Sequence, residues 1–305
     1  MNTIKARNFT LKKIALALMI AVGTVTAAHA ALTGSTGTVQ GEAPTLKAAS
    51  NNAAHAVSFS ASDPAALKTG DTITMTYKYT DTDGDTDDST TTVQWYYVPG
   101  NGTGTPVAIS GPVNTLASGS DGTGMGSSSI VIPDAAVGAR IKAAITEKSL
   151  TGDPREGFTI TYNDVSKIGT YEGGPDDKPA TPTDPTNPDV PDLPVAPGSG
   201  LVAMILEVGG DGTSNLIGSE TKLKVGNTYQ FKLFASDGVT DLTDTVNYQW
   251  KLTGTSATTG TAAPTSLFNP DANFLVPTNT AGKVISGSDD GVQGYGLQVD
   301  YNPKP

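Results

Sequence analysis

The stretch Thr72–Thr80, TITMTYKYT, decides the fold class, because its side chains alternate between apolar and polar. Every second residue from Ile73 to Tyr79 is apolar, and threonines or a lysine stand between them. A period of two residues places one set of side chains on each face of a β-strand. Residues 228–233 repeat the alternation. Both stretches therefore predict strands with one buried face and one wet face.

The two predicted strands belong to a longer internal repeat. Four short segments of the first half, here called anchors, have similar counterparts in the same order in the second half. Residues 67–72 match residues 223–228, and Val93-Gln94-Trp95 matches Tyr248-Gln249-Trp250. Ile132-Pro133 with Gly138 matches Val276-Pro277 with Gly282, and Tyr162-Asn163 matches Tyr301-Asn302. Anchors in one order, separated by loops of variable length, indicate one fold used twice.

Each half is predicted to be all-β. Further strands are expected at residues 57–61, 92–98, 129–132, 140–146 and 158–162, and at residues 201–208, 246–253, 273–276 and 296–301. Gly, Asp, Asn and Pro separate these segments. The pattern predicts two cysteine-free immunoglobulin-like β-sandwiches in tandem, each with a core tryptophan, Trp95 or Trp250. The predicted domains are residues 56–168 and 201–305.

Residues 169–200 are predicted to be a Pro-rich linker. Seven prolines recur at every third residue from Pro179 to Pro197. Polyproline II has three residues per turn, so such a segment is stiff and spans roughly 55–60 Å at ~3.1 Å per residue. The linker is expected to hold the two domains apart. Residues 31–55 are rich in small and polar residues and are expected to form a mobile N-terminal tail or to supply a donor strand.

Residues 1–30 have the pattern of a secretory signal peptide. A basic start precedes an apolar stretch at residues 14–22, and Ala28-His29-Ala30 is a small-x-small cleavage site. The chain is therefore expected to be secreted through the periplasm, without insertion in a membrane. The full chain carries 19 basic and 30 acidic residues, and cleavage removes four basic residues. Such an acidic protein repels nucleic acid.

The composition excludes several chemistries. The chain has no cysteine, so thiol catalysis and cysteine-based metal sites are excluded. Its two histidines are His29, in the signal peptide, and His55, which is expected to be an exposed bystander. No carboxylate pair with a raised pKa is evident, as a glycosidase would need. The sequence thus predicts a protein that is not an enzyme and has no catalytic residues.

One acidic cluster follows the first predicted strand. Asp81, Asp83, Asp85 and Asp87 alternate with other residues, as calcium ligands do. The cluster is not an EF-hand, because Thr86 replaces the required Gly, Thr92 replaces the final Glu, and strands flank it. Two interpretations stay open: a solvated turn, for which Asp and Gly are the usual residues, and a weak calcium site.

The motif TYKYTDTDGD (residues 76–85), followed by VQWY (residues 93–96), resembles bacterial Ig-like modules of exported and surface proteins. The second half departs from it, since Ser236-Asp237-Gly238 replaces the long acidic run. With its signal peptide and Pro-rich joint, the layout is similar to the exported Ig-like proteins of the ZirT/ZirS type. The resemblance implies association with an intimin- or invasin-like outer-membrane protein, or with a co-exported Ig-like partner, and a role in moderating virulence.

The leading hypothesis is thus an exported binding protein that uses exposed strand edges, above all in its second half. The alternative is an adhesin module that binds host glycan or protein through Tyr96, Tyr97 or Tyr295. A secreted hydrolase is a third hypothesis, with no candidate residues. The sequence does not identify the partner, the interface residues, calcium dependence or the oligomeric state.

Overall fold

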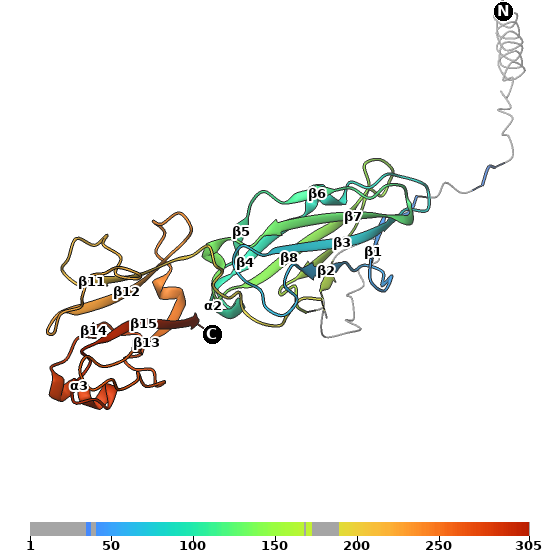
Figure 1. The fold of residues 1–305 in the computed structure, drawn as a ribbon. Helices are drawn as coiled ribbons and strands as arrows, with labels where there is room; N and C mark the ends of the chain where they lie inside the picture. The colour runs from blue at the N-terminus through green and yellow to red at the C-terminus, as the bar shows by residue number, and fades with distance from the viewer. Residues whose placement is uncertain (1–34, 38–40, 168, 173–188, 305) are drawn as a thin grey trace, which may run out of the picture. The chain divides into compact units, whose positions relative to one another are not determined.

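The computed structural model describes residues 35–37, 41–167, 169–172 and 189–304 (Figure 1). The predicted signal peptide lies outside these residues. Within them, most of the secondary structure consists of β-strands in antiparallel sheets, with a few short helices. The predicted all-β class is confirmed. The described residues include no helix that is long and apolar enough to cross a bilayer.

The strands β1–β10 form two five-stranded sheets, here called the N-terminal sheet pair. One sheet has the order β1-β3-β7-β6, and β2 also pairs with β3; the other has the order β10-β9-β8-β4-β5. The strands are β1 (Thr45–Ala48), β2 (Ser58–Ala61), β3 (Thr72–Thr80), β4 (Gln94–Val98), β5 (Val107–Ile109), β6 (Val113–Thr115), β7 (Asp121–Val131), β8 (Arg140–Lys148), β9 (Glu156–Tyr162) and β10 (Thr170–Glu172). The short helices are η1 (Ser89–Thr92), α2 (Pro99–Gly102) and η2 (Asp134–Ala136).

The two sheets of this pair share one core around Trp95. The apolar residues of β3 are all buried, as the alternation predicts. Trp95 is 2% exposed, and its Nε1 donates to Ser128 Oγ at 2.9 Å. The ring of Phe59 packs edge-on against Trp95 and Tyr162. This core therefore joins side chains from both sheets.

The strands β11–β15 form a three-stranded and a two-stranded sheet, here called the C-terminal sheet pair. The orders are β11-β12-β14 and β13-β15. The strands are β11 (Val202–Glu207), β12 (Thr228–Phe234), β13 (Val246–Gly254), β14 (Phe274–Leu275) and β15 (Tyr295–Pro303), with helices η3 (Thr243–Thr245) and α3 (Asn279–Ser286). Trp250 is completely buried, and its Nε1 donates to the carbonyl of Ala272 at 2.7 Å. The second predicted core tryptophan is thus confirmed.

The predicted tail (residues 31–55) and the predicted linker (residues 169–200) both include residues that belong to the N-terminal sheet pair. Leu46 is completely buried and β1 pairs with β3, so the end of the predicted tail belongs to a sheet. Val190 and Val195, within the predicted linker, are buried in the N-terminal core. The physical reason is that apolar residues interrupt both polar segments. Residues 173–188, the centre of the predicted spacer, lie outside the described residues, so a stiff spacer there stays a prediction.

One repeat anchor is also wrong. Tyr162 lies on β9 and pairs with Ala143 of β8. Tyr301 lies on β15 and pairs with Tyr248 of β13, the strand that carries Trp250. The two Tyr-Asn dipeptides therefore occupy different positions relative to the tryptophan strand.

Candidate functional site

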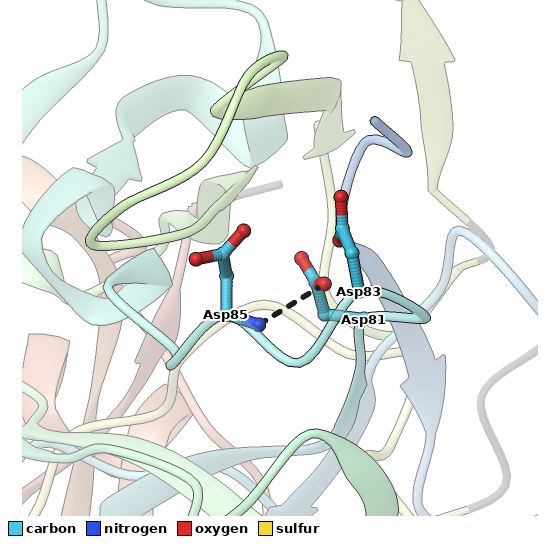
Figure 2. A group of neighbouring side chains, drawn as sticks. All are labelled: Asp81, Asp83 and Asp85. Carbon is cyan, nitrogen blue, oxygen red and sulfur yellow. Dashed lines mark hydrogen bonds between the residues drawn. The ribbon is translucent and has the colours of Figure 1, made fainter. Parts of the chain in front are cut away.

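The acidic loop begins directly after β3 and is held by Asp81. Its Oδ1 accepts the backbone N–H groups of Gly84 and Asp85, at 3.1 and 3.2 Å. Its Oδ2 accepts the hydroxyl of Tyr79 at 3.2 Å. Figure 2 shows the three carboxylates of Asp81, Asp83 and Asp85 gathered in this loop, and their nearest oxygens lie within 4.8 Å of one another. The structure therefore brings together three of the four predicted calcium ligands.

Asp83 and Asp85 also have partners within the protein. Asp83 accepts the backbone N–H of Glu42 at 3.2 Å, and Asp85 accepts the hydroxyl of Thr151. Burial, followed by the neighbouring Asp83 carboxyl, raises the pKa of Asp81. A hydrogen bond from Asp81 lowers the pKa of Asp83. Asp81 is thus the more readily protonated of the two carboxyls, and its protonation would reduce the repulsion between them.

The oxygen ligands in this loop are of the type that Ca²⁺ prefers, and they come from three residues. Each carboxylate, however, already accepts a hydrogen bond from the protein. These bonds connect the loop to residue 42 and to the loop that follows β8. The contacts therefore account for the cluster as a structural turn, and the weak calcium site stays a prediction.

Asp87, the fourth predicted ligand, lies apart from this group. It is buried, and its Oδ2 accepts the hydroxyl of Tyr77 at 2.6 Å and the N–H of Ala117 at 2.8 Å. Its Oδ1 accepts the N–H of Ser89 at 2.9 Å. Burial, followed by the charge of Asp87, raises the pKa of Tyr77 far above its usual value. Asp87 is thus committed to the core of the N-terminal sheet pair.

The prediction that His55 is an exposed bystander is wrong. Its Nδ1 lies 2.9 and 3.0 Å from the two carboxylate oxygens of Glu147, a residue with no exposed surface. Glu147 also accepts the N–H of Leu46 at 2.8 Å and the N–H of Phe158 at 2.9 Å. One carboxylate therefore connects β1 in one sheet to β9 in the other.

The alternation of buried and exposed residues along β8 could have predicted the contacts of Glu147. Ile141, Ala143 and Ile145 are its buried, inward-facing residues, and Glu147 takes the next inward position. A carboxylate at an inward position requires buried donors, because an unpaired buried charge is very costly. The inward position of Glu147 on β8 is thus the sequence feature that could have predicted a partner for His55.

The tyrosines considered as adhesin contacts are at least half-buried. Tyr97 packs against the N-terminal core, and Tyr295 packs against the C-terminal core. The hydroxyl of Tyr295 donates to the carbonyl of Thr261 at 2.9 Å. The hydroxyl of Tyr96 donates to Gln94 Oε1 at 2.7 Å. Their main contacts are thus within the protein.

Within the described residues, β15 has an open strand edge. One edge of this nine-residue strand pairs with β13 along its whole length. No hydrogen bond from the described part of the chain reaches the backbone of its other edge between residues 295 and 303. A groove of about 910 Å³ opens beside the first half of this strand, lined by apolar side chains such as Ile205, Leu223 and Leu297 and by polar ones such as Glu220, Lys222 and Gln298. An unpaired edge beside such a mixed groove is suited to accept a further strand.

No protein-family model matches this chain, and no curated protein is detectably similar to it.

Proposed function

We propose that the chain is an exported, non-enzymatic, immunoglobulin-like binding protein. Its partners would be an intimin-like outer-membrane protein, co-exported Ig-like proteins, or both, and its binding would moderate virulence. The signal-peptide pattern supports export. The resemblance of the motif around Asp81 and Trp95 supports the Ig-like assignment and the class of partner.

The strand order of the N-terminal sheet pair supports the same assignment. Ig-like sandwiches place their strands in two antiparallel sheets, with the core tryptophan on the third main strand. Here β1, β3, β7 and β6 form one sheet, and β9, β8, β4 and β5 lie in the other, with Trp95 on β4. This order is the arrangement expected of an Ig-like sandwich.

The single observation that carries the binding function is the open edge of β15. Soluble proteins usually shorten, charge or cover such edges, because a bare edge pairs readily with other chains. β15 has nine residues, and Asp300 is the one charged residue within it. A long, nearly uncharged open edge is therefore best explained as a binding surface.

A pull-down tests this function. The secreted chain, tagged and immobilised, would be exposed to solubilised outer membrane and culture supernatant of its own organism. We expect it to retain an Ig-like or intimin-like protein, which then co-migrates with it after purification. Retention of neither class of protein would contradict the proposal. A glycan array tests the adhesin alternative, and specific glycan binding without a protein partner would favour that alternative.

A further inference from the structure

The two tryptophan strands, β4 with Trp95 and β13 with Trp250, pair in the same register with β8 and β15, respectively. Trp95 pairs with Ala143 of β8, and Trp250 pairs with Val299 of β15. Tyr97 pairs with Ile141, and Leu252 pairs with Leu297. Residue n of β8 thus corresponds to residue n + 156 of β15. β15 is therefore the counterpart of β8.

In the N-terminal sheet pair, the outer edge of β8 is covered. β9 pairs with residues 143–148, and its Ile160 and Tyr162 enter the core. Beyond β9, the N–H of Val165 donates to the carbonyl of Ile141 at 2.9 Å. Next to it, the N–H of Val195 donates to the carbonyl of Ala139 at 2.9 Å. A continuous layer of apolar side chains therefore closes this side of the core.

In the C-terminal sheet pair, nothing in the described chain takes these places. The inward-facing side chains of β15 remain partly exposed, whereas Ile141, Ala143 and Ile145 are at most 1% exposed. The groove lies beside Tyr295 and Leu297, the counterparts of Ala139 and Ile141. The groove therefore borders the counterparts of the two residues that bond to Val165 and Val195 in the N-terminal pair.

We propose that the open edge of β15 receives one extended segment from another polypeptide, in the place that β9 takes beside β8. This proposal rests on the proposed binding function and identifies its surface. The segment runs antiparallel to β15. It presents apolar side chains to the core opposite Tyr301 and Val299, as Ile160 and Tyr162 do opposite Ile145 and Ala143. A further apolar residue enters the groove beside Leu297.

Charge complementarity adds one requirement to this segment. Asp300 is exposed on the outer face of β15, and its carboxylate has no ion pair or hydrogen bond within the described residues. Its counterpart on β8 is Ala144, which pairs with Thr161. Opposite charges on facing residues of neighbouring strands attract. The incoming segment therefore carries Lys or Arg at the position that corresponds to Thr161.

The donor is a different polypeptide and not a second copy of this chain. Among the described residues, the strands with alternating apolar side chains, such as β3, β8, β9 and β12, are buried in the cores of the two sheet pairs. A second copy would have to open one of its cores to donate such a strand. A partner with a free strand makes the same contacts without this cost.

A labelled peptide tests the proposal on the complete secreted chain. The peptide has the sequence of residues 156–165 with the change Thr161→Lys, and a scrambled peptide is the control. The N-terminal pair cannot bind it, because β9 already occupies that site. We expect binding in fluorescence anisotropy, and slower hydrogen exchange at the amides of Val299 and Tyr301. The scrambled peptide should do neither.

Charge reversal tests the register. We expect Asp300→Lys to weaken binding of the Thr161→Lys peptide roughly threefold, and to favour a Thr161→Glu peptide by a similar factor. Asp244→Lys, an exposed acid outside β15, should change neither. Binding that is equal for both peptides in wild type and Asp300→Lys would overturn the register.

Two results separate this inference from the proposed function. A partner retained in the pull-down equally well by wild type and by Asp300→Lys, with no peptide protection of β15, would overturn the inference and leave the function. Protection of the β15 amides by the peptide, with no Ig-like or intimin-like partner retained, would support β15 as a strand-binding edge and overturn the proposed function. Self-association of the chain that protects the β15 amides would also overturn the inference, because the donor would then be a second copy.

Discussion

The outer edges of β8 and β15 differ although the two strands have one register with their tryptophan strands. β8 is covered by β9, Val165 and Val195, whereas no described residue pairs with the outer edge of β15. At the last inward position of β8, Glu147 collects three donors, and the counterpart on β15 is Pro303. Proline on an edge strand removes a donor that has no partner. The same pairing of a tryptophan strand with its neighbour is thus part of a closed core in the N-terminal sheet pair and leaves an open strand edge in the C-terminal sheet pair.

The largest expected effects come from the two tryptophans. Trp95→Ala and Trp250→Ala should each cost ~3–5 kcal/mol of stability, since both indoles are buried. Denaturant unfolding of the full chain checks this. We also expect Trp95→Phe to cost ~1–3 kcal/mol, because the buried hydroxyl of Ser128 loses a partner. A loss below about 1 kcal/mol for either alanine variant would mean that its core is not built around the tryptophan.

Glu147 gives the next largest effect, confined to the closed edge. Glu147→Ala leaves the amides of Leu46 and Phe158 and the ring of His55 without this acceptor. We expect a loss of ~2–4 kcal/mol, because two buried backbone amides lose their acceptor. Glu147→Gln keeps one acceptor oxygen and should cost less, ~1–3 kcal/mol. Proteolysis followed by mass spectrometry should show new cleavage in β1 and β9. Cleavage first in β15 would contradict the role of Glu147 in closing the N-terminal core.

The acidic loop should respond more to loss of its hydrogen bonds than to calcium. Asp81→Ala removes the acceptor for two backbone amides and for Tyr79, and should cost ~1–3 kcal/mol. A calcium site with a dissociation constant of ~1 mM would add ~1 kcal/mol at about 5 mM calcium. We expect a smaller effect, with the melting temperature rising by less than about 2 °C over an EDTA control. A larger rise that Asp83→Asn abolishes would establish the calcium site.

The smallest expected effect concerns Asp211 in the C-terminal sheet pair. Hydrogen bonds from Ser214 and from the backbone of Thr213 lower the pKa of Asp211 to about 2. A lowered carboxyl pKa stabilises the folded state above the unfolded value of 3.8, and this contribution disappears as the pH falls towards about 2. Melting temperatures of wild type and Asp211→Ala should therefore converge over that interval. Asp244→Ala is the control, and a constant difference between Asp211→Ala and wild type would contradict this assignment.

The sequence predicts what depends on neighbouring residues. The alternation of β3 and β12 is local, so their buried faces follow directly. The burial of both tryptophans follows from the repeat. Short or glycine-rich strands such as β5, β6 and the first part of β7 were missed, because they contain few residues of strong strand preference.

The sequence does not predict which distant strands and side chains pair with one another. A Tyr-Asn dipeptide ends β9 and also lies near the end of β15, yet the two strands have different neighbours. The grouping of Asp81, Asp83 and Asp85 was predicted from spacing. The burial of Asp87 and the contact of His55 with Glu147 depend on partners 30 and 92 positions away. Only the three-dimensional arrangement brings these groups together.

Hydrogen exchange of the free chain tests the central comparison most directly. By strand alternation, the amides of Ala143 and Ile145 face β9, and those of Val299 and Tyr301 face the open edge. We predict slow exchange for the first two amides and fast exchange for the last two. Equal protection of all four would contradict the account, because the edge of β15 would then already be paired.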